Sequence, residues 1–173
     1  MALETRERDE LIARYAAGPE TLRAALAKVP VEALQWRPGP RAWSVHEIVC
    51  HCADSETNAT LRIRTLAVEK DPVIMGYDQD AWAAELDYHA HPLPLALATV
   101  EAVRANTVPL LRRLPEKVWA RVGRHTESGS YGALDWLRSY AEHLEKHSRQ
   151  IGRNLEAWHA RSSNQTHGPV VGT

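Results

Sequence analysis

Phenylalanine is absent from this sequence of 173 residues, and cysteine occurs only twice, as Cys50 and Cys52. The two cysteines are two positions apart in a predicted helix, so their side chains diverge and a disulfide between them is not expected. We interpret both as small buried side chains in a reducing compartment. A second interpretation stays open, in which one of them is a thiolate metal ligand beside His51.

Long apolar runs and an excess of one charge are also missing. No stretch of 18 apolar residues occurs, so the sequence predicts no membrane span. The charged N-terminal decapeptide has no apolar signal-peptide core, which makes a cytoplasmic location the expectation. The formal net charge is −1, with lysine and arginine scattered among acids, and this argues against a nucleic-acid partner.

Four long segments repeat apolar residues every three to four positions, which is typical of amphipathic helices. No run of alternating β-branched residues indicates a strand. The sequence therefore predicts an all-α fold, a four-helix bundle with short extra helices in the connections. We expect the long helices over 3–29, 45–70, 94–114 and 132–159.

Proline and glycine punctuate these helices. Gly18-Pro19 interrupts the first segment and leaves open whether it is one kinked helix or two. Ser44 and Glu47 have the spacing of a capping box at the start of the second. All segments belong to one domain over 1–160, and the polar tail over 161–173 is expected to be disordered.

Three histidines carry the strongest functional signal. His143 and His147 are spaced i, i+4, which places both imidazoles on one helix face, about 40° apart. His51 lies in a different predicted helix. If the three meet, they form a three-histidine site for a divalent metal that leaves coordination positions open, as a catalytic metal requires. Spacing alone leaves the alternative of ordinary core or surface histidines equally open.

Other metal and catalytic motifs fit poorly. A zincin motif, His-Glu-x-x-His, would need glutamate at position 144, which is Leu144. The matched Glu-x-x-His repeats of di-iron bundles are absent, as are Cys-x-x-Cys and P-loop motifs. The sequence therefore favours a three-histidine site over these classes.

Several separated motifs resemble one family. The segment RPGPRAWSVHEIVCHCADSE, from Arg37 to Glu56, looks like the signature of the DinB superfamily. Asp78–Trp82, His125–Gly129 and Tyr140-x-x-His143-x-x-x-His147-x-x-x-Ile151 follow in the order of its YfiT-like branch. The resemblance implies an up-down-down-up four-helix bundle that forms a homodimer. It also implies a divalent metal, zinc or nickel with iron and manganese as alternatives, held by His51, His143 and His147.

The same resemblance implies a choice of reactions. The family includes metal-dependent hydrolases and transferases that attach bacillithiol or mycothiol to electrophiles. We therefore expect a metal-dependent enzyme acting on a small molecule, as a low-molecular-weight-thiol S-transferase or a hydrolase. The alternative is a non-catalytic metal-binding module in stress response or dimerisation, which a closed four-ligand sphere would favour.

Further residues have candidate roles around this site. His125 is a candidate acid, base or fourth ligand, with a surface loop histidine as the alternative. Arg64, or its neighbour Arg62, is a candidate for binding an acid group of a thiol cofactor, with a solvated or ion-paired arginine as the alternative. Glu47, Asp54 and Tyr140 are candidates for orienting the imidazoles.

Overall fold

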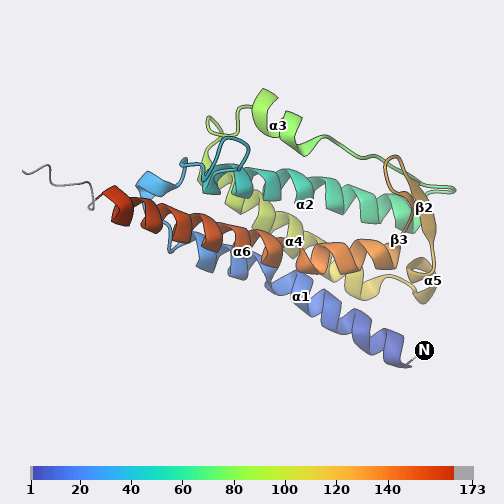
Figure 1. The fold of residues 1–173 in the computed structure, drawn as a ribbon. Helices are drawn as coiled ribbons and strands as arrows, with labels where there is room; N and C mark the ends of the chain where they lie inside the picture. The colour runs from blue at the N-terminus through green and yellow to red at the C-terminus, as the bar shows by residue number, and fades with distance from the viewer. Residues whose placement is uncertain (1, 166–173) are drawn as a thin grey trace, which may run out of the picture.

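Four long helices lie side by side in the computed structural model, which describes residues 2–165 and the side chains of 5–161 (Figure 1). Helices α1 and α6 run in one direction, and α2 and α4 run in the other. Each helix packs against two neighbours: α1 and α2 both pack on α4 and on α6. This up-down-down-up bundle confirms the predicted fold. The helices are α1 (Ala2–Leu26), α2 (Val45–Val68), α4 (Leu93–Arg113) and α6 (Ala133–Gln165).

Helix α1 continues through Pro19, so the first predicted segment is one helix and not two. A proline inside a helix has no N–H for the carbonyl four residues before it. In α1 that carbonyl belongs to Tyr15, and it is satisfied from another helix, as described below.

Helix α2 begins at the predicted capping box. The Ser44 hydroxyl accepts a hydrogen bond from the Glu47 N–H at 3.2 Å, and the Glu47 carboxylate accepts one from the Ser44 N–H at 2.8 Å. Two otherwise unpaired backbone N–H groups are satisfied in this way. The cap fixes where α2 starts and therefore where His51 lies along it.

Short elements fill the connections, as predicted. They are a 3-10 turn at Val31–Ala33, helix α3 (Gln79–Glu85) and helix α5 (Glu116–Trp119). Asp78 caps α3 by accepting hydrogen bonds from two backbone N–H groups at 3.0 Å. Helix α3 lies on the long crossover from α2 to α4, alongside the bundle.

A small sheet at one end of the bundle corrects the expectation that no strand is present. Its strands are β1 (Val73–Ile74), β2 (Val122–His125) and β3 (Gly129–Gly132). Strand β1 pairs parallel to β2, and β2 and β3 form an antiparallel hairpin. The strands have two to four residues, too few for an alternating pattern to show. The sheet ties the α2–α4 crossover to the hairpin and pairs Ile74 with His125.

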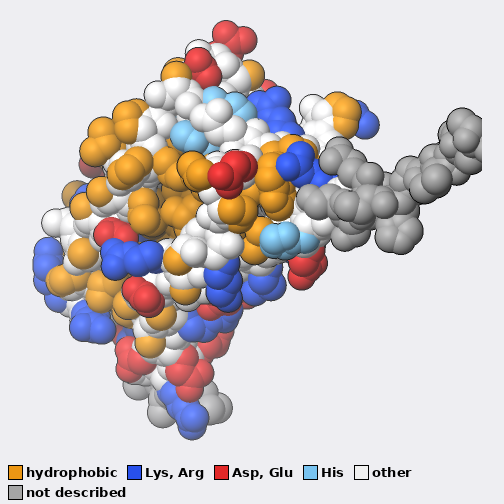
Figure 2. All heavy atoms as spheres, turned by 90° about the vertical axis from the view of Figure 1, so that its left-hand side faces the viewer, with side chains coloured by type: hydrophobic (Ala, Val, Ile, Leu, Met, Phe, Trp, Pro, Cys, Tyr) orange, Lys and Arg blue, Asp and Glu red, His pale blue; other side chains and the backbone are white. Residues whose placement is uncertain are grey.

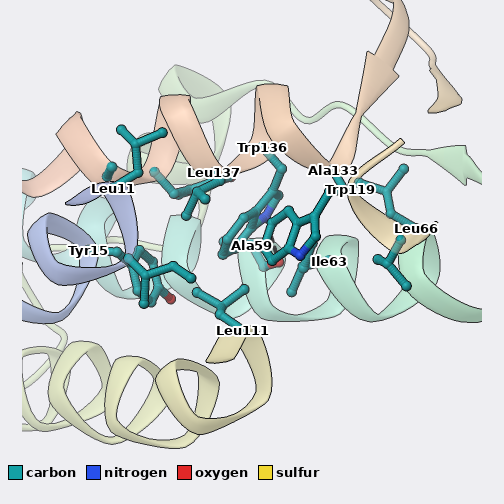
Figure 3. Close-up of a cluster of buried hydrophobic side chains, with 14 of the residues drawn as sticks. Leu11, Tyr15, Ala59, Ile63, Leu66, Leu111, Trp119, Ala133, Trp136 and Leu137 are labelled. Atoms are coloured by element: carbon teal, nitrogen blue, oxygen red, sulfur yellow. Dashed lines mark hydrogen bonds between the residues drawn. The ribbon is translucent and has the colours of Figure 1, made fainter. Parts of the chain in front are cut away.

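The core is built without phenylalanine around large tryptophan, tyrosine and aliphatic side chains (Figure 3). Trp136 is fully buried, and its indole N–H donates to the carbonyl of Ala59 at 2.9 Å. Its ring lies 5.5 Å from that of Tyr15, so one indole joins α6 to α2 and α1. A buried aromatic ring contributes most when its polar atom also has a partner.

Helix α6 extends to Gln165, five residues beyond the predicted domain end at 160. The rest of the predicted tail, 166–173, lies outside the described residues. No described helix combines the length and apolar character that a membrane span needs.

Candidate metal centre

The structure brings the three predicted histidines together. One nitrogen from each of His51, His143 and His147 lies within 4.8 Å of the others. The ring centroid of His51 is 5.5 Å from that of His143 and 4.8 Å from that of His147. The i, i+4 pair itself is 4.6 Å apart, as neighbouring turns of α6 require. Packing of α2 on α6 completes the group.

The outer nitrogens of the α6 pair lie close to acceptor oxygens. His147 Nδ1 lies 2.9 Å from Gln150 Oε1, so an N–H at Nδ1 leaves the Nε2 lone pair free. His143 Nδ1 lies 3.4 Å from Glu56 Oε1, and its Nε2 lies 3.3 Å from the Ser55 hydroxyl. The Glu56 contact is within ion-pair distance but is not aligned as a hydrogen bond. Both rings can therefore present Nε2 to a shared ion.

His51 has a buried nitrogen with no partner. Its Nδ1 makes no hydrogen bond, although the residue is 3% exposed. The Trp43 ring covers it, with centroids 4.8 Å apart. Buried polar atoms without partners are rare in folded proteins and call for an explanation such as an ion. The donor set of three imidazoles fits a divalent metal of the zinc type.

Burial and neighbouring imidazoles favour the neutral form of His51 and His147, which is the form that binds a metal. Burial, together with the neighbouring His147 and His143, lowers the pKa of His51 to about 2. Burial and His143 lower the pKa of His147 to about 4. Both imidazoles are therefore neutral at pH 7, and only a neutral imidazole can donate a lone pair to a metal.

A cavity of about 590 Å³ opens beside the three histidines. Its volume is within the range of small-molecule sites. The crossover from α2 to α4 and the β2–β3 hairpin supply its far wall, so the small sheet that sequence analysis missed positions part of the site. Apart from the three histidines, its lining consists of Ser55, Arg62, Tyr77, Asp78, Gln79, Asp80, His125 and Glu127.

His125 and Arg62 line this cavity, whereas Arg64 does not. Arg64 instead donates to the carbonyl of Thr60 at 2.8 Å and to Asn106 Oδ1 at 2.9 Å, which joins α2 to α4. The arginine predicted to bind a cofactor acid group is thus placed away from the cavity. Two positions separate the arginines on the helix, and this turns them to different faces.

The guanidinium of Arg62 is held by neutral groups. It donates to the Tyr140 hydroxyl at 3.1 Å and to the Met75 carbonyl at 2.6 Å. Its Cζ lies 5.9 Å from the centre of the Tyr77 ring. Within residues 5–161, no carboxylate forms an ion pair with it. Arg62 therefore adds a positive charge, without a direct ion pair in the described chain, to a cavity wall that also carries Asp78, Asp80 and Glu127.

The two cysteines stay out of the group. Cys50 Sγ lies 3.6 Å from the Tyr88 carbonyl, and Cys52 is fully buried in the core. Burial raises the pKa of Cys50 to about 12 and that of Cys52 well above its ordinary value. Both remain thiols, and neither joins the histidines in the part of the chain that the structure describes.

The three residues predicted to orient the imidazoles form hydrogen bonds with other groups. Glu47 caps α2 and pairs with Arg37, and Asp54 accepts a hydrogen bond from the Tyr88 hydroxyl. Tyr140 lies beside His143, with centroids 5.6 Å apart, but its hydroxyl accepts from Arg62.

Three further residues contact the histidines directly and were not predicted from the sequence: Glu56, Gln150 and Trp43. Glu56 had a signal that was not used: a carboxylate on the inward stripe of α2, between Cys52 and Ala59. Gln150 follows His147 by three residues on the same helix face. The position of Trp43 depends on the conformation of the loop before α2, which has no periodic pattern from which it could be predicted.

Two proteins described as metal-dependent hydrolases are similar to this chain in sequence. A protein of Oceanobacillus iheyensis named "putative metal-dependent hydrolase" is 32% identical over 133 residues, which is 77% of each chain. One of the same description from Bacillus licheniformis is 27% identical, over 87% of this chain and 90% of its own.

The fold has a solved counterpart. YfiT from Bacillus subtilis, described as a probable metal-dependent hydrolase with an unusual four-helix bundle topology, superposes with a TM-score of 0.71. The match covers 85% of this chain and 89% of YfiT at 24% identity. The family model of the DinB superfamily matches residues 14–151, which include all three histidines. The chain therefore belongs to the DinB superfamily.

Proposed function

We propose that the chain is a divalent-metal-dependent enzyme that acts on a small molecule, with His51, His143 and His147 as the metal ligands. The observation that carries this proposal is the convergence of three imidazoles, from two helices, on the wall of one cavity. The relatives named as metal-dependent hydrolases support it.

The ligand set favours a catalytic over a structural role. Within the described chain, no cysteine or carboxylate joins the three histidines, so the protein supplies three ligands and leaves the rest of the sphere open. This argues against the closed site of a non-catalytic module. Imidazole donors suit zinc or nickel, with iron or manganese as alternatives. When bound, such an ion would supply Lewis-acid activation of a water or a thiol.

Hydrolysis and thiol transfer are the two reactions that this site fits. The names of the relatives favour hydrolysis. Thiol transfer is the second candidate, and the cavity of about 590 Å³ has room for part of a thiol cosubstrate such as bacillithiol or mycothiol.

His125 and Arg62 have defined roles in this proposal. His125 Nδ1 accepts the backbone N–H groups of Glu127 and Ser128 at 3.2 and 3.3 Å. In the neutral ring the proton is then on Nε2, so His125 can donate it to a substrate atom. Arg62 would bind an anionic group of the substrate or thiol through its remaining N–H donors.

The test combines metal analysis with two assays. Purified protein should hold one divalent ion per chain, and His51→Ala should lose it, whereas the exposed His159→Ala on α6 should not. An ester and amide panel tests hydrolysis, and addition of a low-molecular-weight thiol to a bimane electrophile tests transfer. If the protein binds no divalent ion and His51→Ala changes neither activity, the proposal fails.

We also propose that the chain forms a homodimer, and the molar mass measured by light scattering would test this.

A further inference from the structure

A buried ionic cluster lies directly behind His143. Glu56 is 0% exposed and Arg104 is 1% exposed, and their Oε1 and Nη2 atoms are 2.6 Å apart. Arg104 also donates to the carbonyls of Tyr15 at 2.6 Å and Tyr140 at 2.8 Å. The Tyr15 hydroxyl donates to Glu56 Oε2 at 3.2 Å. One guanidinium and one carboxylate thus connect all four long helices.

Stability alone does not account for this pair. Removing two charges from water costs several kcal/mol per ion, and apolar side chains of similar volume often stabilise a core equally well. Beyond these hydrogen-bonding groups the surroundings are apolar, because the Tyr15 ring lies 4.0 Å from Arg104 Cζ and Leu144 lies nearby. The charges therefore call for a role that an apolar core would not supply.

Helix α1 is adapted to hold Arg104. Pro19 has no N–H, so the carbonyl of Tyr15 lacks its helical donor, and this is the carbonyl that accepts from Arg104 Nη1. Gly18 provides the room: a Cβ at this position would overlap the Arg104 guanidinium and lie 3.1 Å from Leu144 Cδ1. The Gly18-Pro19 interruption thus supplies both an acceptor and a space for the same side chain.

The remaining neighbour of the cluster is His143. Its Nδ1 is buried, has no hydrogen-bond partner and lies 3.4 Å from Glu56 Oε1. Its Nε2 is on the side of Ser55 and the cavity. Histidines that bind a metal commonly donate their other N–H to a carboxylate, which fixes both the tautomer and the ring direction.

We propose that Glu56 is a positioning residue for His143: its carboxylate, locked by Arg104 against Gly18-Pro19, holds the proton on Nδ1 and directs Nε2 to the metal centre. The inference rests on the proposed function, because it assigns a purpose to the orientation of a metal ligand. Arg104 acts one step further back, since it fixes the carboxylate and offsets its charge.

Two variants separate positioning from stability. Glu56→Leu/Arg104→Met removes both charges at similar volume, so the bundle is expected to fold. Its affinity for Zn²⁺, measured by chelator competition, should fall about 10- to 100-fold. Glu56→Gln keeps an acceptor oxygen and should lose less than the double variant, but more than threefold. Glu142→Gln, an exposed carboxylate on α6 paired with Lys146, is the control and should bind like the unchanged protein.

A second readout needs no metal. Long-range proton–nitrogen NMR of the metal-free protein should show His143 as the Nδ1–H tautomer, and the double variant should show a mixture. If the double variant does not fold, Glu56→Gln decides by the same two measurements. Zn²⁺ affinity within threefold of the unchanged protein in the folded variants, or an unchanged tautomer, would overturn the inference. If the unchanged protein binds no metal, the proposed function fails, while the tautomer still tests the role of Glu56.

Discussion

His51 of α2 and His147 of α6 face each other with ring centroids 4.8 Å apart, and at His147 the effect of burial on the pKa outweighs the opposing charge of Glu56. Both rings are therefore held neutral inside the bundle. The neutral rings have nitrogen lone pairs that can bind a cation, and they bind protons only weakly.

The metal-free protein should lose stability in mild acid. The folded-state pKa values, about 2 for His51 and about 4 for His147, lie below the ordinary value of about 6.5. Below pH 6.5 the unfolded chain binds protons that the folded chain excludes, so the free energy of unfolding falls as pH falls. The expected slope is about 1.4 kcal/mol per pH unit for each histidine.

Urea unfolding in the presence of a chelator, at pH 7.5 and 5.5, measures this loss. His147→Gln should reduce the difference between the two pH values, and His159→Gln, which changes an exposed histidine, should not. Equal stability of the unchanged protein at both pH values would contradict the predicted shifts.

The two thiols should be inert in the native protein. Burial raises the pKa of both Cys50 and Cys52, and the thiolate is the reactive form. A chromogenic disulfide reagent at pH 8 should label neither cysteine until guanidinium unfolds the chain, and then both. The double variant Cys50→Ala/Cys52→Ala should bind Zn²⁺ as the unchanged protein does. Weaker binding would instead show a cysteine acting as a ligand.

The capping box should contribute measurably to stability. Ser44→Ala removes the side-chain acceptor for the Glu47 N–H, together with the 2.8 Å contact of that hydroxyl to His89 Nε2, and should lower the free energy of unfolding by about 1 kcal/mol. Thr99→Ala is a suitable control, because that hydroxyl only donates to a carbonyl of its own helix, and we expect a change within about 0.5 kcal/mol. Chemical denaturation of both variants makes the comparison, and equal losses would refute a special role for the cap.

Arg62 and Arg64 provide a matched pair for anion binding. Arg62 lines the cavity and forms no ion pair with a residue whose side chain is described, whereas Arg64 is hydrogen-bonded to Thr60 and Asn106. A small dicarboxylate such as succinate should bind the zinc-loaded protein at least about tenfold more weakly after Arg62→Ala. A change of this size corresponds to the loss of one hydrogen bond to a charged group. Arg64→Ala should leave its calorimetric Kd unchanged. Equal effects of the two variants would remove Arg62 from the proposed site.

Local sequence signals predicted the helices and the histidines, because caps, i, i+4 spacing and apolar periodicity act within a few residues. Ser44 and Glu47 marked the start of α2, and His143 and His147 marked one face of α6. The sheet was missed because strands of two to four residues, such as Gly129–Gly132, carry no periodic pattern.

The tertiary contacts of the site could not be predicted in the same way. Glu56 and Arg104 are single charges on inward stripes of two helices, and only packing of these helices shows that they pair. Arg62 and Arg64 differ in sequence position by two, and only the bundle shows which faces the cavity. Pro19 left open whether the first segment is one helix or two, and only the structure shows that it frees an acceptor for Arg104 within one helix.

The most direct test of the central claim is anomalous diffraction from crystals of the zinc-loaded protein, recorded on both sides of the zinc absorption edge. We predict one strong peak per chain, bounded by a nitrogen from each of His51, His143 and His147, with no fourth protein ligand. A peak at another place, or a sphere closed by a fourth side chain of the protein, would contradict an open three-histidine metal centre.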